Sequence, residues 1–462
     1  MSKRIFFVLM LLTFFNSCIF GQLSEDKRMI RQLHELSVTK GKAYDWLEFL
    51  CKDIGHRLSG SPQLAAATNY TYYLMKELGF DSVWLQSCKV PHWERGPKEI
   101  VRVTGSVEGQ FDLSALALGN TWGTGPNGVS GEVIAVYGLE QLSKMPDSLV
   151  KGKIVFFNRP FAEAPLNTFE SYGMTVDQRG GGPALAAKKG AIAALVRSVT
   201  SSNDDIPHTG GSWFGEEGPF IAAYAIGCQS ADRLAHALKL GKVVAYCQSD
   251  SRMLPDADGW NVIGEIRGSK YPEEIIVVGG HLDSWDVGEG AHDDGAGTVQ
   301  SIEVLQLLRL AGYKPQRTIR AILFTNEENG ARGGKAYKTF TDKTNEKQIL
   351  AIESDAGGHS PQGFTWESTD KYEGKYRDRL MQWKNILDEY GYRFIFGYSG
   401  VDIEPLKPHH GLLMGLLPDS QRYFDYHHSA KDTFDKVNRR ELELGAAAMA
   451  SIVYLADRYG IR

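Results

Sequence analysis

The chain has 462 residues, 42% of them hydrophobic and 23% charged, which is typical of a folded soluble protein with about two domains. The formal net charge of -5 argues against a protein that binds nucleic acid, because such proteins present a basic face to the phosphates. The activity therefore has to be sought in the motifs, taken along the chain.

The N-terminus has the pattern of a secretory signal peptide. Two basic residues precede an apolar run over 5–15, and Gly21 supplies a small residue at the expected cleavage site. The run is too short for a membrane-spanning helix, which needs about 20 apolar residues. We therefore expect a cleaved signal over 1–21 and a secreted or periplasmic protein without a membrane span. Lipid anchoring at Cys18 is less favoured, because the residues before it are too bulky for a lipoprotein site.

The cysteines of the mature chain show no metal-binding or redox spacing. They are Cys51, Cys88, Cys228 and Cys247. Export permits a disulfide, but spacing alone assigns none, and buried free thiols are the favoured interpretation.

Residues 22–104 and 105–250 differ in pattern. The first segment has helical periodicity over 23–50 and 63–78, followed by strands near 83–85 and 99–103. From residue 105 to 250, short apolar strands alternate with glycine-rich turns and two short helices. This change predicts a β-rich domain inserted into a larger one.

Residues 251–462 alternate strands with helices. The strands 261–267 and 274–280 are separated by a turn and predict a hairpin. Further strands are expected over 318–325 and 350–353, and helices over 298–310, 334–340, 372–390 and 440–459. The alternation predicts an α/β fold with a mixed, mainly parallel sheet flanked by helices.

Candidate metal ligands follow three of these strands and precede the last helix. They are His281, Asp293, Glu327, Glu328, Asp355, His427 and His428. Each motif alone is common: adjacent glutamates often lie on solvated helices, and paired histidines often lie on surfaces. Strands of a parallel sheet, however, direct their carboxyl ends to one edge, where α/β proteins place their active sites. Their occurrence at several strand ends therefore favours a metal centre.

These residue types suit a pair of zinc ions. Imidazole and carboxylate groups bind zinc, and a shared carboxylate lets two ions lie about 3.5–4 Å apart. Such a pair can hold a bridging hydroxide and polarise a carbonyl. Side chains of adjacent residues diverge, so we expect Glu328 to bind metal and Glu327 to act as general base. Asp283 is expected to accept a hydrogen bond from His281 and orient its ring.

At these residues the chain resembles the co-catalytic zinc exopeptidases, which include bacterial leucyl aminopeptidases and prostate-specific membrane antigen. The matching motifs are HLDSWDVGEGAHDDGAG, FTNEENGARGGKAY, ESDAGG and YHHSAKDT, and the resemblance is greatest to the carboxypeptidase Q branch. Segment 105–250, with GKIVFFNRP, is similar to a protease-associated domain. The resemblance implies that His281 and Asp355 hold one zinc, that Glu328 and His428 hold the other, and that Asp293 bridges both.

The chain departs from the family pattern beside the last ligand. Many relatives have a tyrosine there that donates to the oxyanion, whereas this chain has His427, so the donor could be His427, Tyr426 or Tyr423. Asp294 stands where many relatives have asparagine. Candidates for recognising a free substrate terminus are the loop 398–402, Lys407 and Arg422.

The sequence thus predicts a secreted exopeptidase with two zinc ions per chain that hydrolyses dipeptides or removes terminal residues from short peptides. An aminopeptidase of the same family is an alternative, and a non-catalytic binding protein on the same scaffold is another. A related amidohydrolase or glutaminyl cyclase is a third, less favoured because it has no reason to carry the inserted domain. The resemblance also implies a homodimer.

Overall fold

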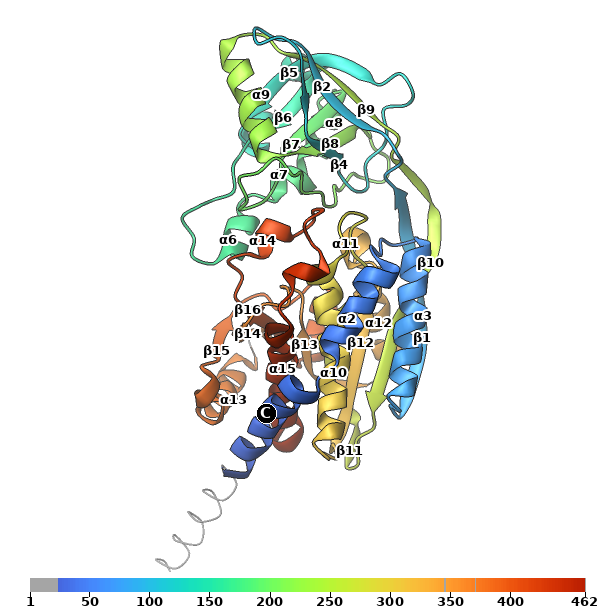
Figure 1. Ribbon diagram of the computed structural model, residues 1–462, viewed down its shortest axis with the longest axis vertical. Coiled ribbons are helices and arrows are strands. Elements are labelled where there is room, and N and C mark those ends of the chain that lie inside the picture. The colour runs from blue at the N-terminus through green and yellow to red at the C-terminus, as the bar shows by residue number, and fades with distance from the viewer. Residues whose placement is uncertain (1–23, 345, 370, 462) are drawn as a thin grey trace, which may run out of the picture.

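The computed structural model describes residues 24–344, 346–369 and 371–461. Two eight-stranded sheets, each with its own helices, lie one above the other in Figure 1. The predicted α/β architecture is confirmed. The predicted signal over 1–21, with Cys18, lies outside the described residues. Within the described part of the chain, no helix is long and apolar enough to cross a bilayer.

The first sheet carries the strands whose ends hold the candidate ligands. In spatial order its strands are β1 (Ser82–Glu94), β10 (Arg252–Ile266), β12 (Arg317–Phe324), β11 (Tyr271–His281), β13 (Lys347–Glu353), β16 (Leu412–Pro418), β14 (Pro361–Glu367) and β15 (Arg393–Phe396). The four central strands β12, β11, β13 and β16 are mutually parallel. β10 joins one side antiparallel, and β14 joins the other antiparallel.

The predicted hairpin between the strands now labelled β10 and β11 is wrong. β12 lies between them, antiparallel to β10 and parallel to β11. The turn after β10 is bonded to the segment that enters β12, with Ser269 N donating to Pro315 O at 3.0 Å and Tyr271 N donating to Gln316 O at 2.7 Å. A local turn signal cannot reveal a strand inserted from about 50 residues later.

Alternate residues of β11 pack on opposite faces of this sheet, as strand geometry requires. Ile276 and Val278 belong to the larger core, and Ile275 and Val277 to the smaller one. The larger core is covered by the helix over 24–40, α2 (Ala43–Phe49), α3 (Pro62–Glu77), α10 (Ala296–Leu310), α13 (Glu373–Ile386) and α15 (Arg439–Tyr459). The smaller core is covered by α12 (Arg332–Thr344) and η4 (Glu404–His409). Both faces are therefore buried.

The second sheet is built from the middle of the chain. Its order is β3 (Phe111–Leu113), β2 (Glu99–Gly105), β9 (Val244–Ser249), β5 (Val129–Val136), β6 (Ile154–Phe157), β7 (Ala193–Arg197), β8 (Ala222–Ile226) and β4 (Ala115–Ala117). Its helices are α4 (Leu139–Lys144), α5 (Asp147–Val150), α6 (Thr168–Gly173), α7 (Asp177–Gly180), α8 (Gly182–Lys188) and α9 (Cys228–Leu240). We call residues 99–249 the upper unit.

The upper unit begins earlier than the boundary at residue 105 expected from the sequence. β2 pairs with β9 and β3 of this sheet, so this strand belongs to the upper unit and not to the N-terminal segment. The change of pattern at residue 105 marks the turn after β2, where glycine content rises, and not the point where the chain changes sheets. The four described cysteines are free thiols, three of them buried, and Cys88 is half-buried.

Candidate metal centre

The parallel strands bring the predicted ligands to one edge of the first sheet. His281 is the last residue of β11, Glu328 follows β12 in the short helix α11 (Glu327–Gly330), and Asp355 follows β13. Asp293 lies in η2 (Ala291–Gly295), before α10. His428 follows α14 (Tyr423–Tyr426), in the segment between β16 and α15.

Asp293 lies between two groups of ligands. Its Oδ1 is 3.2 Å from His281 Nε2, which is also 3.4 Å from Asp355 Oδ1. Its Oδ2 is 3.1 Å from His428 Nε2, which is also 3.0 Å from Glu328 Oε2. One carboxylate therefore presents one oxygen to each group, as a bridging ligand must.

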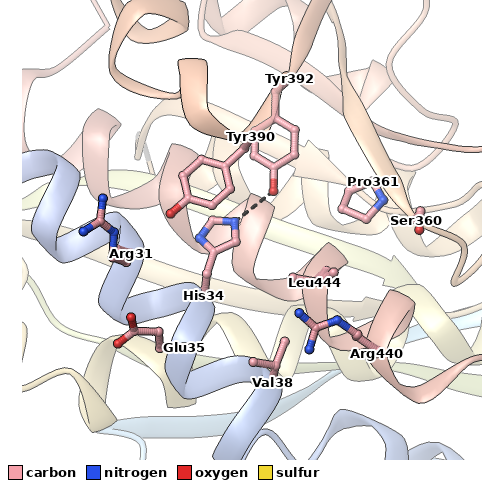
Figure 2. Close-up of a pocket in the computed structure, with 10 residues that line it drawn as sticks. All are labelled: Arg31, His34, Glu35, Val38, Ser360, Pro361, Tyr390, Tyr392, Arg440 and Leu444. Carbon is pink, nitrogen blue, oxygen red and sulfur yellow. Dashed lines mark hydrogen bonds between the residues drawn. The ribbon is translucent and has the colours of Figure 1, made fainter.

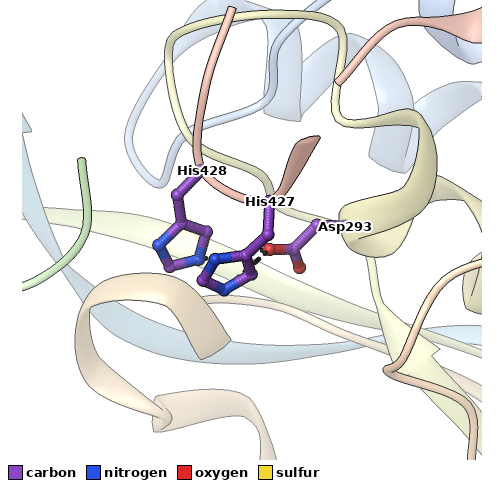
Figure 3. Close-up of side chains that lie close together, drawn as sticks. All are labelled: Asp293, His427 and His428. Atoms are coloured by element: carbon purple, nitrogen blue, oxygen red, sulfur yellow. Dashed lines mark ion pairs between the residues drawn. The ribbon is translucent and has the colours of Figure 1, made fainter. Parts of the chain in front are cut away.

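His427 lies beside the second group. Figure 3 shows its ring lying against that of His428 near Asp293, with a centroid separation of 3.6 Å. His427 Nε2 is 3.6 Å from Asp293 Oδ2. Burial lowers the pKa of His427 well below its usual value, and the neighbouring His428 lowers it further, so the ring is neutral.

Both candidate ligand histidines are held in the tautomer that a metal needs. His281 Nδ1 is 3.0 Å from the main-chain oxygen of Asp283, and His428 Nδ1 is 3.3 Å from that of Thr209. A carbonyl only accepts, so each of these contacts places a proton on Nδ1. Arg179 Nη1 also lies 3.4 Å from His428 Nδ1, but it makes its shorter contact, 3.1 Å, by donating to the Thr209 oxygen. The lone pair of each Nε2 is then directed into the site.

Asp283 does not act on His281 as the sequence predicted. Its carboxylate is 3.7 Å from His281 Nδ1, and its main-chain oxygen makes the orienting contact instead. The carboxylate accepts from Glu327 N at 3.0 Å and from Glu328 N at 3.3 Å. The prediction was wrong because two residues after a strand end the chain has turned, so the carboxylate reaches the next strand end. Asp283 thus positions the two glutamates.

The site holds more buried carboxylates than positively charged side chains. Burial raises the pKa of Glu327, Glu328 and Asp355, and the other carboxylates raise it further. Burial alone would lower the pKa of His281, but Asp355 and Asp293 raise it well above its usual value. Isolated buried charges are costly and need partners. A bound cation would supply them.

Unsatisfied atoms converge at the same place. Among the described residues, His281 Nε2, Asp293 Oδ2 and Glu328 Oε1 are buried without a hydrogen-bond partner. Buried polar groups are otherwise almost always paired. Nitrogen and carboxylate donors in this arrangement fit zinc, so the residues present fit the metal that the sequence implies.

Two further aspartates shape the site, although no such role was predicted for them. Asp432 accepts from His292 N at 2.7 Å and Asp293 N at 3.1 Å, which fixes the backbone of the bridging residue. Asp294 accepts from His281 N at 2.9 Å and Gly297 N at 2.9 Å. Their only sequence signal was their place within the motifs around Asp293 and His428.

A cavity of about 980 Å³ opens onto the ligands. The sheet edge and the upper unit both line it, the latter through residues such as Phe169, Tyr172 and Trp213. Of the three predicted oxyanion donors, His427 and Tyr423 line the cavity, whereas Tyr426 stacks on His292 outside it.

The residues predicted to recognise a substrate terminus are divided. Within the loop 398–402, residues 398–401 line the cavity, but Asp402 is fully buried behind them. Lys407 lies outside the lining and donates to Glu367 Oε2 at 2.6 Å. Arg422 also lies outside and has Glu441 3.8 Å away.

A smaller cavity of about 420 Å³ lies between the helix 24–40, the start of β14 and the start of α15. In Figure 2, His34 lies under Tyr390 and is bonded through Nε2 to Tyr392 OH at 2.9 Å. Its Nδ1 bonds Ile30 O, so both ring nitrogens are satisfied. This histidine is therefore a packing residue and not a ligand.

Comparison with known proteins identifies related peptidases. The model of peptidase family M28 matches residues 261–453. Carboxypeptidase Q of Xenopus laevis is 35% identical over 440 residues, covering 94% of this chain and 90% of that protein.

Solved structures show the same fold. An M28 peptidase precursor from Shewanella amazonensis has 29% identity and a TM-score of 0.89, covering 95% of this chain and 99% of its own. A zinc aminopeptidase from Bacillus subtilis, 18% identical, covers 90% of this chain and 94% of its own with a TM-score of 0.62. With a relative more than 30% identical across almost its whole length, the chain belongs to peptidase family M28 and is a zinc metallo-exopeptidase of that family.

Proposed function

We propose that this protein is a secreted exopeptidase that uses two zinc ions per chain to hydrolyse dipeptides or remove terminal residues from short peptides. His281 and Asp355 would hold one ion, Glu328 and His428 the other, and Asp293 both. The observation that carries the proposal is the placement of Asp293, with one oxygen toward each histidine at 3.2 and 3.1 Å.

The chain's own residues would divide the remaining work. Bound zinc would lower the pKa of a water molecule and polarise the carbonyl of the scissile peptide bond. Glu327 lines the cavity beside Glu328, and its carboxylate would take the proton from that water and deliver it to the leaving amine. Burial raises the pKa of Glu327, which helps this carboxylate to hold the proton between the two transfers.

We assign His427 as the donor to the oxyanion. Its ring lines the cavity, and its Nε2 lies 3.6 Å from the bridging carboxylate, so an Nε2–H would point toward the reacting carbonyl. Tyr423 also lines the cavity and is the competing donor.

The cavity suits a small substrate. Its volume of about 980 Å³ lies at the upper end of the range for small-molecule sites, and aromatic side chains such as Phe169, Tyr172 and Trp213 line its outer wall. A dipeptide or the end of a short peptide fits this size, and the aromatic wall favours apolar side chains.

The roles of zinc and of Glu327 can be tested by removing each in turn. Protein treated with a chelator should lose peptidase activity and regain it as zinc reaches two ions per chain. Glu327→Gln should lower kcat by at least about 10²-fold with its zinc content unchanged. Full activity of this variant would refute the role of Glu327, and full activity with one ion per chain would refute the two-metal proposal.

Free, amino-blocked and carboxyl-blocked dipeptides should then be compared. Loss of cleavage on blocking either end identifies a dipeptidase, whereas loss only on amino-blocking identifies the alternative, an aminopeptidase. No cleavage of any peptide by the zinc-loaded protein would favour a non-catalytic binding protein.

Export and assembly complete the proposal. A cleaved signal over 1–21 predicts that the mature chain found outside the cytoplasm begins near Gln22, which N-terminal mass spectrometry can check. A lipid on Cys18 would contradict it. The homodimer implied by the resemblance predicts a mass in light scattering of twice that of the mature chain, which is the 51.2 kDa full chain without its signal.

A further inference from the structure

The loop that carries His428 is held largely by the upper unit. It runs over 420–429, between β16 and α15, and belongs to neither sheet. Thr168, Thr200 and Ser201 of the upper unit donate to Ser420 O, Phe424 O and Asp425 Oδ1 at 2.9, 2.6 and 2.8 Å. In Figure 1, α14 of this loop lies beside α6 and below α7.

His208 makes a contact as short as that of Thr200. Its Nδ1 is 2.6 Å from the main-chain oxygen of His427, and because a carbonyl only accepts, Nδ1 carries the proton. His208 is fully buried, and burial lowers its pKa to about 4. A neutral ring with its single proton at Nδ1 therefore donates to the peptide group just before His428.

Thr209 completes a two-way contact with the ligand itself. Thr209 N donates to His428 O at 2.8 Å, and Thr209 O accepts from His428 Nδ1 at 3.3 Å. The same carbonyl accepts from Arg179 Nη1 at 3.1 Å, which fixes its direction. His428 has φ +59°, a conformation that a non-glycine residue adopts only when its surroundings impose it. Two of the contacts that surround it come from Thr209 of the upper unit.

The two histidines of the site are thus supported differently. His281 ends a strand of the first sheet, and the oxygen that orients it comes from Asp283, two residues along. His428 takes its orienting oxygen from Thr209, which is 219 residues away in sequence. One metal position is therefore complete within the first sheet, whereas the other depends on a second unit.

We propose that His208 is a positioning residue for the metal site, and that zinc binding at the Glu328–His428 position, but not at the His281–Asp355 position, depends on the contact between His208–Thr209 and the His428 loop. The inference rests on the proposed two-zinc site. It assigns the upper unit a part in building the metal centre, beyond lining the cavity.

The test measures zinc at each position separately, by competition with a chromophoric chelator on the full mature chain. Asp355→Ala leaves the Glu328–His428 position to be titrated, and Glu328→Ala leaves the other. His208→Leu should lower zinc affinity about 10–100-fold in the Asp355→Ala background and leave it unchanged in the Glu328→Ala background. His208→Asn keeps an N–H near the place of Nδ1 and should restore affinity to within a few-fold of the unsubstituted chain. His208→Gln places its N–H farther out and should not.

His236→Leu is the matched control, because this histidine lies in α9 of the same unit with 61% of its side chain exposed. It should change neither affinity. The proposal would be overturned if His208→Leu weakened zinc binding equally in both backgrounds or left it unchanged in the Asp355→Ala background. It would also be overturned if the Asn and Gln variants of His208 bound zinc equally well.

The outcome is separable from that of the proposed function. Zinc titration needs no substrate, so a chain that binds two ions with the predicted dependence on His208 but cleaves no peptide would leave this inference standing and refute the peptidase assignment. An active two-zinc enzyme whose His208 variants bind zinc normally would do the reverse.

Discussion

Removing the carboxylate of Asp283 should destabilise the strand end that carries both glutamates. The side chain is fully buried and accepts from Glu327 N and Glu328 N at 3.0 and 3.3 Å. Hydrogen bonds to a charged acceptor contribute about 1.5–3 kcal/mol each, and Asp283→Ala leaves both amides buried without a partner. The free energy of unfolding should therefore fall by about 3–6 kcal/mol.

Asp283→Asn tests separately whether the side chain holds the two glutamate amides and whether it orients His281. Its amide oxygen can accept from one of the two backbone amides, but its NH₂ group faces the other, so we expect roughly half or more of the loss seen with alanine. Zinc affinity at the His281–Asp355 position should persist, because His281 Nδ1 donates to the main-chain oxygen of Asp283.

The measurement is urea unfolding of the metal-free protein, followed by zinc titration in the Glu328→Ala background. Asp258→Asn removes an exposed carboxylate that pairs with Lys89 and serves as the control. The reasoning would be refuted if the Asp283→Asn protein had normal stability but bound zinc tenfold or more weakly at the His281–Asp355 position. That result would show that the carboxylate itself orients the histidine.

Three further predictions address the donor, a buried acid and a buried cation. His427→Ala should lower kcat by about 10²–10³-fold with little change in KM, and Tyr423→Phe should change it little; the reverse result in steady-state kinetics would reassign the oxyanion donor. Burial raises the pKa of Glu443 to about 7, so its folded value exceeds its unfolded value and the stability it contributes is lost as pH rises toward 7. Glu443→Gln should remove this dependence, so between pH 5 and 8 its free energy of unfolding should rise by on the order of 2 kcal/mol relative to that of the unsubstituted protein. Thermal or urea unfolding at each pH measures this, and parallel curves of unfolding free energy against pH for the two proteins would contradict it. Arg57 is fully buried and donates to four main-chain oxygens, so Arg57→Lys should cost about 3–5 kcal/mol in urea unfolding, whereas the exposed Arg439→Lys should cost almost nothing; equal losses would count against this role.

The convergence of the candidate metal ligands could be predicted from the sequence because the signals for it are local. The run over 275–278 is continuously apolar, as expected of a parallel strand buried on both faces, and the polar residues start where it ends. Once the strands are parallel, their ends must meet at one edge. The convergence of His281, Glu328 and Asp355 follows from that rule and needs no knowledge of strand order.

Strand order and side-chain direction could not be predicted in the same way. The turn between β10 and β11 signals a hairpin, yet the pairing partner of both strands lies about 50 residues later in β12. β14, β15 and β16 were not predicted: β15 has only four residues, whereas β16 carries an apolar run, LLMGLLP, of the kind that marks a buried strand. The direction of the Asp283 carboxylate depends on where the adjacent strand ends, which is also a property of the assembled sheet.

The contacts that hold the His428 loop against the upper unit could not be predicted from the sequence. The sheet determines the position of a residue at a strand end, such as His281. A residue in a loop outside both sheets must be fixed by contacts, and here the contacts come from Thr209, far away in sequence. A motif can identify such a residue as a ligand, but only the folded chain shows what holds it there. Changes in the upper unit should therefore lower zinc occupancy at the Glu328–His428 position before they affect the other position.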